Sequence, residues 1–81
     1  MKCLIFDWYG TKLVPDAIEA PTEVQEQFPA RKIFEVEIEI IEDLLKLAKQ
    51  HGNIMLSPPN KGPLKGHWSI AISDNEFRQR G

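Results

Sequence analysis

Residues 32–40, with the sequence KIFEVEIEI, constrain the fold more than any other segment of this chain. Four apolar residues alternate with three glutamates there: Phe34, Val36, Ile38 and Ile40 against Glu35, Glu37 and Glu39. Side chains of a strand point alternately to two faces, so the pattern predicts a strand with one buried and one wet face. Such a one-sided strand favours an antiparallel or mixed sheet.

The period changes directly after this segment, at residues 41–51. In a helix, the apolar residues of this segment would lie along one side: Ile41, Leu44, Leu45 and Ala48. Acidic residues in the first turn and basic residues near the end suit the helix dipole. We therefore expect a helix over 41–51, with Gly52 as the left-handed residue that ends it.

Further extended segments are expected at 2–9, 53–57 and 67–73, with a short piece at 12–14. The segments 53–57 and 67–73 are joined by a loop and should form an antiparallel hairpin. The predicted fold class is therefore α+β: a small antiparallel or mixed β-sheet of about four strands, with the helix packed on one face.

A chain of 81 residues has room for one domain, which we place at 1–81. Residues 15–30 contain three prolines and are expected to form a connector with at most one or two helical turns, in which Thr22 could cap a turn through Gln27. Residues 74–81 form a polar tail.

Cysteine usage and the N-terminus point to the cytoplasm. The single cysteine, Cys3, excludes an internal disulfide and alternates with apolar neighbours, as a buried thiol would. The apolar run that ends at Phe6 is too short for a signal peptide or a membrane span. We expect a cytoplasmic protein with no membrane partner.

Charge is distributed unevenly along the chain. Residues 1–45 contain ten acidic and four basic side chains, whereas residues 46–81 contain two acidic and six basic ones. The net charge of −2 does not support direct nucleic-acid binding, which needs a basic surface. The distribution does allow an acidic face and a basic face on opposite sides of the domain.

The first candidate partner-binding set is Glu35, Glu37 and Glu39. A row of carboxylates on the wet face of a strand could imitate nucleic-acid phosphates and bind a basic protein. The alternative is a solvated face that resists edge aggregation. A single strand gives no convergent cage for a metal ion, and no Cys/His spacing suits zinc. No metal site and no cofactor are predicted.

The second candidate set lies in the segment 57–68. Its partner-binding residues are Asn60, Lys61, Lys65, His67 and Trp68. The two Lys-Gly pairs could present amide and ammonium groups to an anion, although the spacing is not that of a P-loop. The alternative is a tether whose prolines limit its entropy.

The stretch LIFDWYGTKL, residues 4–13, resembles motif I of the haloacid dehalogenase superfamily, an apolar strand followed by Asp-x-Asp-Gly-Thr with Tyr9 in place of the second Asp. The resemblance implies Asp7 as the nucleophile, with Ser57 matching the Ser/Thr of motif II. However, residues 58–81 offer no acidic pair, and Lys12 replaces the usual apolar residue. We interpret the match as a coincidence, and no catalytic residue is predicted.

The stretches IEIIEDLLKLAKQHGNIMLS and WSIAISDNEF together resemble short phage-encoded proteins, which include inhibitors of bacterial defence such as anti-CRISPR proteins. The resemblance implies a small stoichiometric inhibitor of a large host nuclease complex, and no functional residue can be carried over. We therefore expect a non-enzymatic protein-binding module. The alternatives are a housekeeping interaction module or homodimer that pairs through a strand edge, and a haloacid-dehalogenase-like phosphotransfer fragment that uses Asp7.

Overall fold

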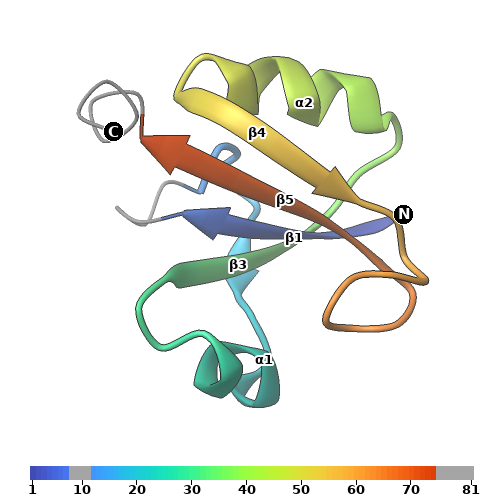
Figure 1. Ribbon diagram of the computed structural model, residues 1–81. Helices are drawn as coiled ribbons and strands as arrows, with labels where there is room; N and C mark the ends of the chain where they lie inside the picture. The colour runs from blue at the N-terminus through green and yellow to red at the C-terminus, as the bar shows by residue number, and fades with distance from the viewer. Residues whose placement is uncertain (8–11, 75–81) are drawn as a thin grey trace.

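A five-stranded mixed sheet with two helices forms the fold in the computed structural model, which describes residues 1–7 and 12–74 (Figure 1). In chain order the elements are β1 (Lys2–Asp7), β2 (Ile18–Glu19), α1 (Thr22–Gln27), β3 (Lys32–Glu37), α2 (Ile41–Lys49), β4 (Gly52–Ser57) and β5 (His67–Asp74). The α+β class expected from the sequence is confirmed, with one strand and one helix more than predicted.

The strands lie side by side in the order β2-β3-β1-β5-β4. The central strand β1 pairs antiparallel with β3 and parallel with β5, so the sheet is mixed. The predicted antiparallel hairpin is present as β4 and β5. Within the described part of the chain, β2 and β4 are therefore the two edge strands.

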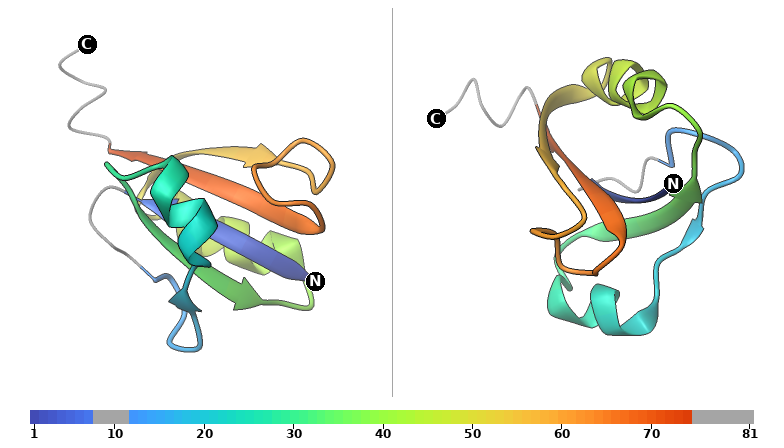
Figure 2. Two further views of the ribbon diagram at one scale, coloured as in Figure 1. Left: turned by 90° about the horizontal axis from the view of Figure 1, so that it is seen from below. Right: turned by 90° about the vertical axis from the view of Figure 1, so that its right-hand side faces the viewer.

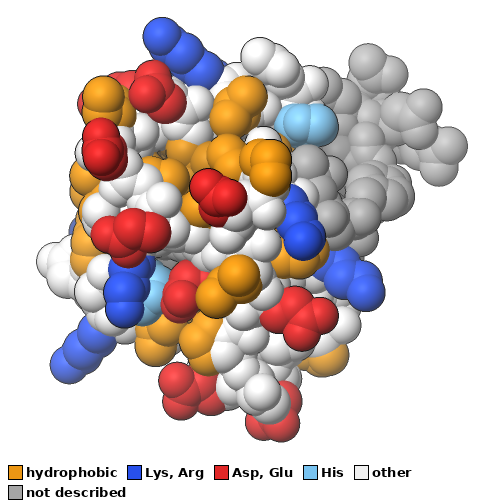
Figure 3. All heavy atoms as spheres, turned by 180° about the vertical axis from the view of Figure 1, so that it is seen from behind, with side chains coloured by type: hydrophobic (Ala, Val, Ile, Leu, Met, Phe, Trp, Pro, Cys, Tyr) orange, Lys and Arg blue, Asp and Glu red, His pale blue; other side chains and the backbone are white. Residues whose placement is uncertain are grey.

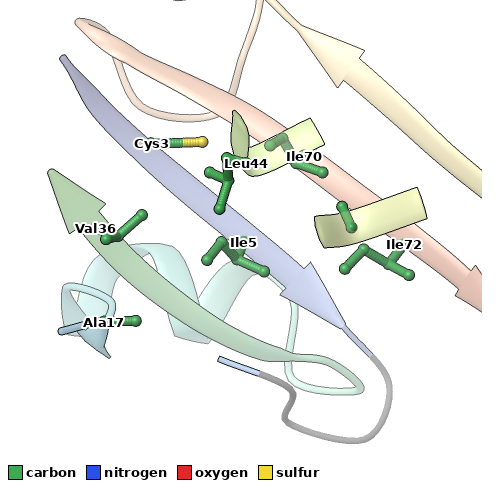
Figure 4. Close-up of a cluster of buried hydrophobic side chains, with 8 residues drawn as sticks. Cys3, Ile5, Ala17, Val36, Leu44, Ile70 and Ile72 are labelled. Atoms are coloured by element: carbon green, nitrogen blue, oxygen red, sulfur yellow. The ribbon is translucent and has the colours of Figure 1, made fainter. Parts of the chain in front are cut away.

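One face of the sheet, called the α2 face below, packs against α2. Its core contains Cys3 and Ile5 of β1, Ile70 and Ile72 of β5, and Leu44 of α2 (Figure 4). These side chains are almost fully buried. Burying each large aliphatic side chain contributes about 1.5–3 kcal/mol, so this cluster is the main source of stability.

The opposite face, called the α1 face below, is partly covered by α1, and Figure 2 shows the two helices on opposite sides of the sheet. Val24 of α1 packs with Leu4, Phe6 and Ile33 in a second buried cluster. The one or two helical turns expected within 15–30 are present as α1, but the prediction of a helix on one face only was incomplete. Since Val24 is the only buried residue of this six-residue helix, α1 has no helical stripe that a sequence pattern could show.

The strand expected over 32–40 ends at Glu37. The amide of Ile38 donates a hydrogen bond of 2.8 Å to the carbonyl of Met1, and the chain then turns toward α2. Ile40 consequently caps the N-terminus of α2 and is 54% exposed. The alternating pattern predicted that Ile40 is buried. This prediction is wrong, because β3 ends before Ile40.

Residues 12–14 do not form the expected extended piece. Leu13 lies in a bend with a left-handed φ of 71°, and the next strand is instead Ile18–Glu19, which pairs with β3. Thr22 does not cap α1 as expected: it is the first helical residue, Pro21 is the cap, and no side chain bonds to the free amides. Asp74, which was expected in the polar tail, is the last residue of β5. The rest of that predicted tail, 75–81, and residues 8–9 of the expected first strand lie outside the described part.

Gly52 does not end α2 in a left-handed conformation, as was predicted. The helix ends at Lys49, and the positive-φ glycine among the described residues is Gly66. Gly52 is instead the first residue of β4 and is buried. A Cβ at this position would collide with the carbonyl oxygen of Ser73, so close approach of β5 explains the glycine.

Candidate functional site

The three glutamates of the alternating segment have different surroundings. Glu37 is exposed at the end of β3, and its Oε1 lies 3.1 Å from the amino group of Met1. Glu39 is exposed in the bend that follows, and Glu35 is partly buried on the α1 face. The expected row of three carboxylates on one strand is wrong, because β3 ends before Glu39. Their role in partner binding stays a prediction.

The structure brings together Glu35 and His67, which belong to different predicted sets. His67 Nε2 lies 2.8 Å from Glu35 Oε2, and their side chains are 11% and 23% exposed. His67 Nδ1 lies 3.3 Å from the carbonyl oxygen of Lys65. His67 is thus held on two sides, and it ties the end of the 58–66 loop to the sheet.

The 58–66 loop is ordered by its own backbone. The amides of Lys61 and Gly62 both donate to the carbonyl of Pro58, at 3.0 and 3.1 Å, and Leu64 packs against the cluster on the α1 face. Three of the predicted binding residues in this loop are exposed: Asn60, Lys61 and Lys65. They remain accessible to a partner or an anion.

Trp68 lies on the opposite side of the sheet from His67. It is partly buried and packs against the core beneath α2, whereas His67 lies on the α1 face. Adjacent residues of a strand point to opposite faces, so the two cannot belong to one compact site. Trp68 therefore acts mainly as a core residue.

Ser69, His67 and Glu35 share the α1 face but do not form a nucleophilic triad. Both ring nitrogens of His67 face oxygens other than the Ser69 hydroxyl. Ser69 Oγ is buried without a hydrogen-bond partner among the described residues, and a Cβ at Gly62 would lie 2.7 Å from it. A serine nucleophile needs a base within hydrogen-bond reach, and this arrangement offers none.

Asp7 and Ser57, the two positions that match the haloacid dehalogenase motifs, lie apart. Asp7 ends β1 and is buried, whereas Ser57 ends β4, which is separated from β1 by β5. Because β4 runs antiparallel to β5 and hence to β1, Ser57 is level with Ser69 and Leu4 instead of Asp7. Nucleophile and second motif therefore do not converge.

The remaining chemical groups give no further site. Cys3 is fully buried, and burial raises the pKa of its thiol to about 12, so it is not a nucleophile at neutral pH. Across residues 1–7 and 12–74, no three His, Cys, Asp or Glu side chains gather in a way that could hold a metal ion. No helix in the described ranges combines the length and apolarity needed to cross a membrane.

The structure shows which strand edge is open, whereas the sequence suggested pairing through a strand edge only as an alternative and did not indicate the strand. Among residues 1–7 and 12–74, β5 is the one strand that pairs with β4, and none of the six residues of β4 is charged. Met55 is 70% exposed and Leu56 is 38% exposed, on opposite faces of the strand. Proteins normally protect such an edge with charges, prolines or a covering element. The missing charges in 52–57 were the signal available in the sequence.

A cavity of about 380 Å³ adjoins β4 on the α1 face, and we call it the Phe28 groove. Its walls are formed by Phe6, Phe28, Arg31, Met55, Ser57, Pro63, Ser69 and Ala71. The rings of Phe6 and Phe28 pack edge to face, with centroids 5.2 Å apart. The groove thus combines an aromatic wall, a flexible methionine and a guanidinium group.

Gln25 holds the wall of this groove that carries Phe28 and Arg31. Its Nε2 donates to the carbonyls of Phe28 and Arg31 at 3.2 and 2.6 Å, and its Oε1 accepts from the amide of Ile33 at 3.2 Å. One side chain therefore fixes the turn between α1 and β3, and with it the position of the groove wall.

Two other hollows are weaker candidates. The larger, of about 560 Å³, lies beside α1 and includes the charged residues Glu19, Glu26 and Lys32. The smaller, of about 190 Å³, lies at the start of α2 and includes Glu39 and Leu47. Neither adjoins the open edge of β4, so we place the candidate site at the Phe28 groove and that edge.

The face of the molecule seen in Figure 3 carries charges of both signs. Figure 3 shows acidic and basic side chains interspersed with apolar ones over one face. A uniform acidic surface that imitates nucleic acid is therefore absent from this face of the described residues. Electrostatics alone gives no preferred binding surface there.

Comparison of the chain with protein-family models, curated proteins and solved structures found no significant match.

Proposed function

We propose that this chain is a small protein-binding module without catalytic activity of its own. The observation that carries the proposal is the Phe28 groove beside the uncharged edge of β4. Phe28 and Met55 both line this groove and are 37% and 70% exposed. Exposed apolar groups that adjoin a groove mark interaction sites.

The residue types in the groove support a protein partner over a small-molecule substrate. Aromatic residues, methionine and arginine are enriched in the buried centres of protein interfaces. Phe28 and Arg31 would be the anchors, and Met55 can adapt its shape to a partner side chain. The exposed residues predicted from the 58–66 loop, Lys61 and Lys65, flank Pro63 of the groove wall and would contribute to a polar rim.

The narrower form of the proposal is a stoichiometric inhibitor of a bacterial defence complex, acting in the cytoplasm. What supports it is the resemblance of residues 38–57 and 68–77 to short phage-encoded inhibitors, together with the absence of a catalytic arrangement in the described part of the chain. A domain of this size that has no chemistry to perform can act by occupying a surface of a larger assembly.

A pull-down from a bacterial lysate tests the proposal, with the purified chain as bait and mass spectrometry as readout. The test variant is Phe28→Ala, and the matched control is Ile40→Ala, an exposed apolar residue distant from the groove in sequence and absent from its walls. Removing an anchor costs more than 1 kcal/mol, so partner affinity should fall about tenfold in the first variant and stay unchanged in the control.

Circular dichroism and thermal melting must show that both variants are folded under the binding conditions. If the wild-type chain captures a partner and Phe28→Ala captures it equally well, the groove is not the binding site. If the wild-type chain captures nothing at fixed stoichiometry, the inhibitor form of the proposal is wrong.

A further inference from the structure

The edge of β4 is suited to pairing with an identical edge. A strand edge offers a row of backbone donors and acceptors that another strand can bind. β4 has six residues, near the usual strand length, whereas the other described edge strand, β2, has only two. No residue of β4 is charged, so a second copy approaching this edge meets no like-charge repulsion from the strand itself.

The side-chain pattern of β4 is symmetric about Met55. Register with β5 places Ile54 and Leu56 opposite the core residues Ile72 and Ile70, hence on the α2 face. Asn53, Met55 and Ser57 therefore lie on the α1 face. Reading outward from Met55 in either direction, the strand shows an aliphatic residue and then a small polar residue.

This symmetry selects one register for an antiparallel pair of β4 strands. Centred on Met55, the pair sets Met55 opposite Met55 of the second copy, Ile54 opposite Leu56, and Asn53 opposite Ser57. Opposed residues then share a face and a chemical type, as cross-strand pairs require. Centring the pair on Ile54 or Leu56 instead would oppose Met55 to a polar residue.

We propose that two copies of this chain pair through β4 about a two-fold axis at Met55, which joins the two sheets into one. Such an interface is isologous, the commonest arrangement of homodimers. It adds a strand along the side of β4 that faces away from β5, and it covers the exposed side chains of Met55 and Leu56.

The pairing also changes the Phe28 groove. Met55 is part of the groove wall, so Met55 of the second copy would stand beside it at the two-fold axis. The two grooves would then meet on the α1 face of the joined sheet and offer a partner one continuous apolar surface. This consequence for binding rests on the proposed function, whereas the pairing itself does not.

Cysteine cross-linking tests the register directly. Opposed residues of antiparallel strands have Cα atoms about 4.5–5.5 Å apart, within the range of a disulfide. Met55→Cys should therefore form a dimer band under mild oxidation that reduction removes. The native Cys3 does not interfere, because it is fully buried.

Two matched variants check that register. Asn53→Cys and Ser57→Cys should each give no cross-linked dimer band when oxidised alone, because four residues of strand, about 13 Å, separate each position from the same position of the second copy. An equimolar mixture of these two should cross-link. If Met55→Cys does not cross-link, or if all three single variants cross-link equally, the proposed pairing is wrong.

A charge swap at Met55 tests the dimer without any covalent bond. Light scattering should give twice 9.3 kDa for the wild-type chain and 9.3 kDa for both Met55→Lys and Met55→Glu, because like charges then lie directly opposite each other. Mixing the two variants should restore the doubled mass.

A wild-type chain that stays at 9.3 kDa, or a mixture that stays monomeric, would overturn the proposal. The Phe28→Ala variant separates this result from the proposed function. It should keep the doubled mass while losing partner capture, since Phe28 is not part of β4.

Discussion

At the scale of single residues, Cys3 links the core to the pH dependence of stability. Burial raises the pKa of its thiol from 9.0 to about 12 in the folded chain, so folding favours the protonated form. This contribution is complete below pH 9 and is lost as the pH rises toward 12, at about 1.4 kcal/mol for each pH unit.

We therefore expect Cys3→Val to lose less stability than the wild-type chain between pH 9 and pH 12. Denaturant unfolding at several pH values measures the difference, and the comparison cancels the contributions that the two proteins share. Equal slopes in the two proteins would contradict the burial argument. The native thiol should also resist a thiol reagent at neutral pH until the chain is unfolded.

Single residues also show which contacts can be predicted from the sequence and which cannot. The burial of Cys3 was predictable, because its apolar neighbours determine it locally. The contact of Glu35 with His67 was not, because it joins residues on β3 and β5 across the intervening strand β1. A glutamate in an alternating strand indicates a wet position, and only the tertiary structure shows that a histidine meets it there.

At the scale of elements, the turn between α1 and β3 depends on one side chain. Gln25→Ala would remove three hydrogen bonds and leave the amide of the buried residue Ile33 without its side-chain partner. An orphaned buried donor costs about 1–3 kcal/mol, so we expect a loss of that order in the free energy of unfolding. Partner capture should weaken as well, because the groove wall loses its support.

Gln27→Ala is the matched control for this change. Gln27 lies on the same helix, but its side chain donates only one exposed hydrogen bond, to the carbonyl of Glu23 at 3.1 Å. Its substitution should change stability by less than about 0.5 kcal/mol, as is usual for surface positions. Similar losses in both variants, measured by denaturant unfolding, would show that Gln25 has no special role.

The two helices differ in how well the sequence predicts them. The switch from period 2 to period 3.6 places the start of α2 at Ile41 correctly, because burial on one face leaves a regular trace in sequence. The sequence indicated α1 only as one or two turns in a connector, since α1 buries only Val24 and is fixed by contacts of Gln25 to residues beyond the helix. The candidate groove depends on that turn, so it could not be predicted.

At the scale of the whole molecule, the position of each strand in the sheet predicts how hydrogen exchange is distributed. β1 lies between β3 and β5, and Cys3 to Asp7 are buried, so its amides should open only with global unfolding. Amides of the edge strand β4 should exchange faster in a monomer, because among the described residues a strand covers it on one side and none on the other.

Pairing through β4 makes this pattern depend on protein concentration. Raising the concentration should slow exchange in residues 52–57, because association protects the amides at the interface. Exchange in β1 should stay unchanged, because its amides already open only with global unfolding. In Met55→Lys the same residues should exchange at one rate at every concentration. Mass-spectrometric hydrogen exchange on both proteins measures this. Equal exchange in 52–57 for the wild-type chain at low and high concentration would mean that the edge stays open, and the uncharged sequence of β4 would then serve a partner other than a second copy.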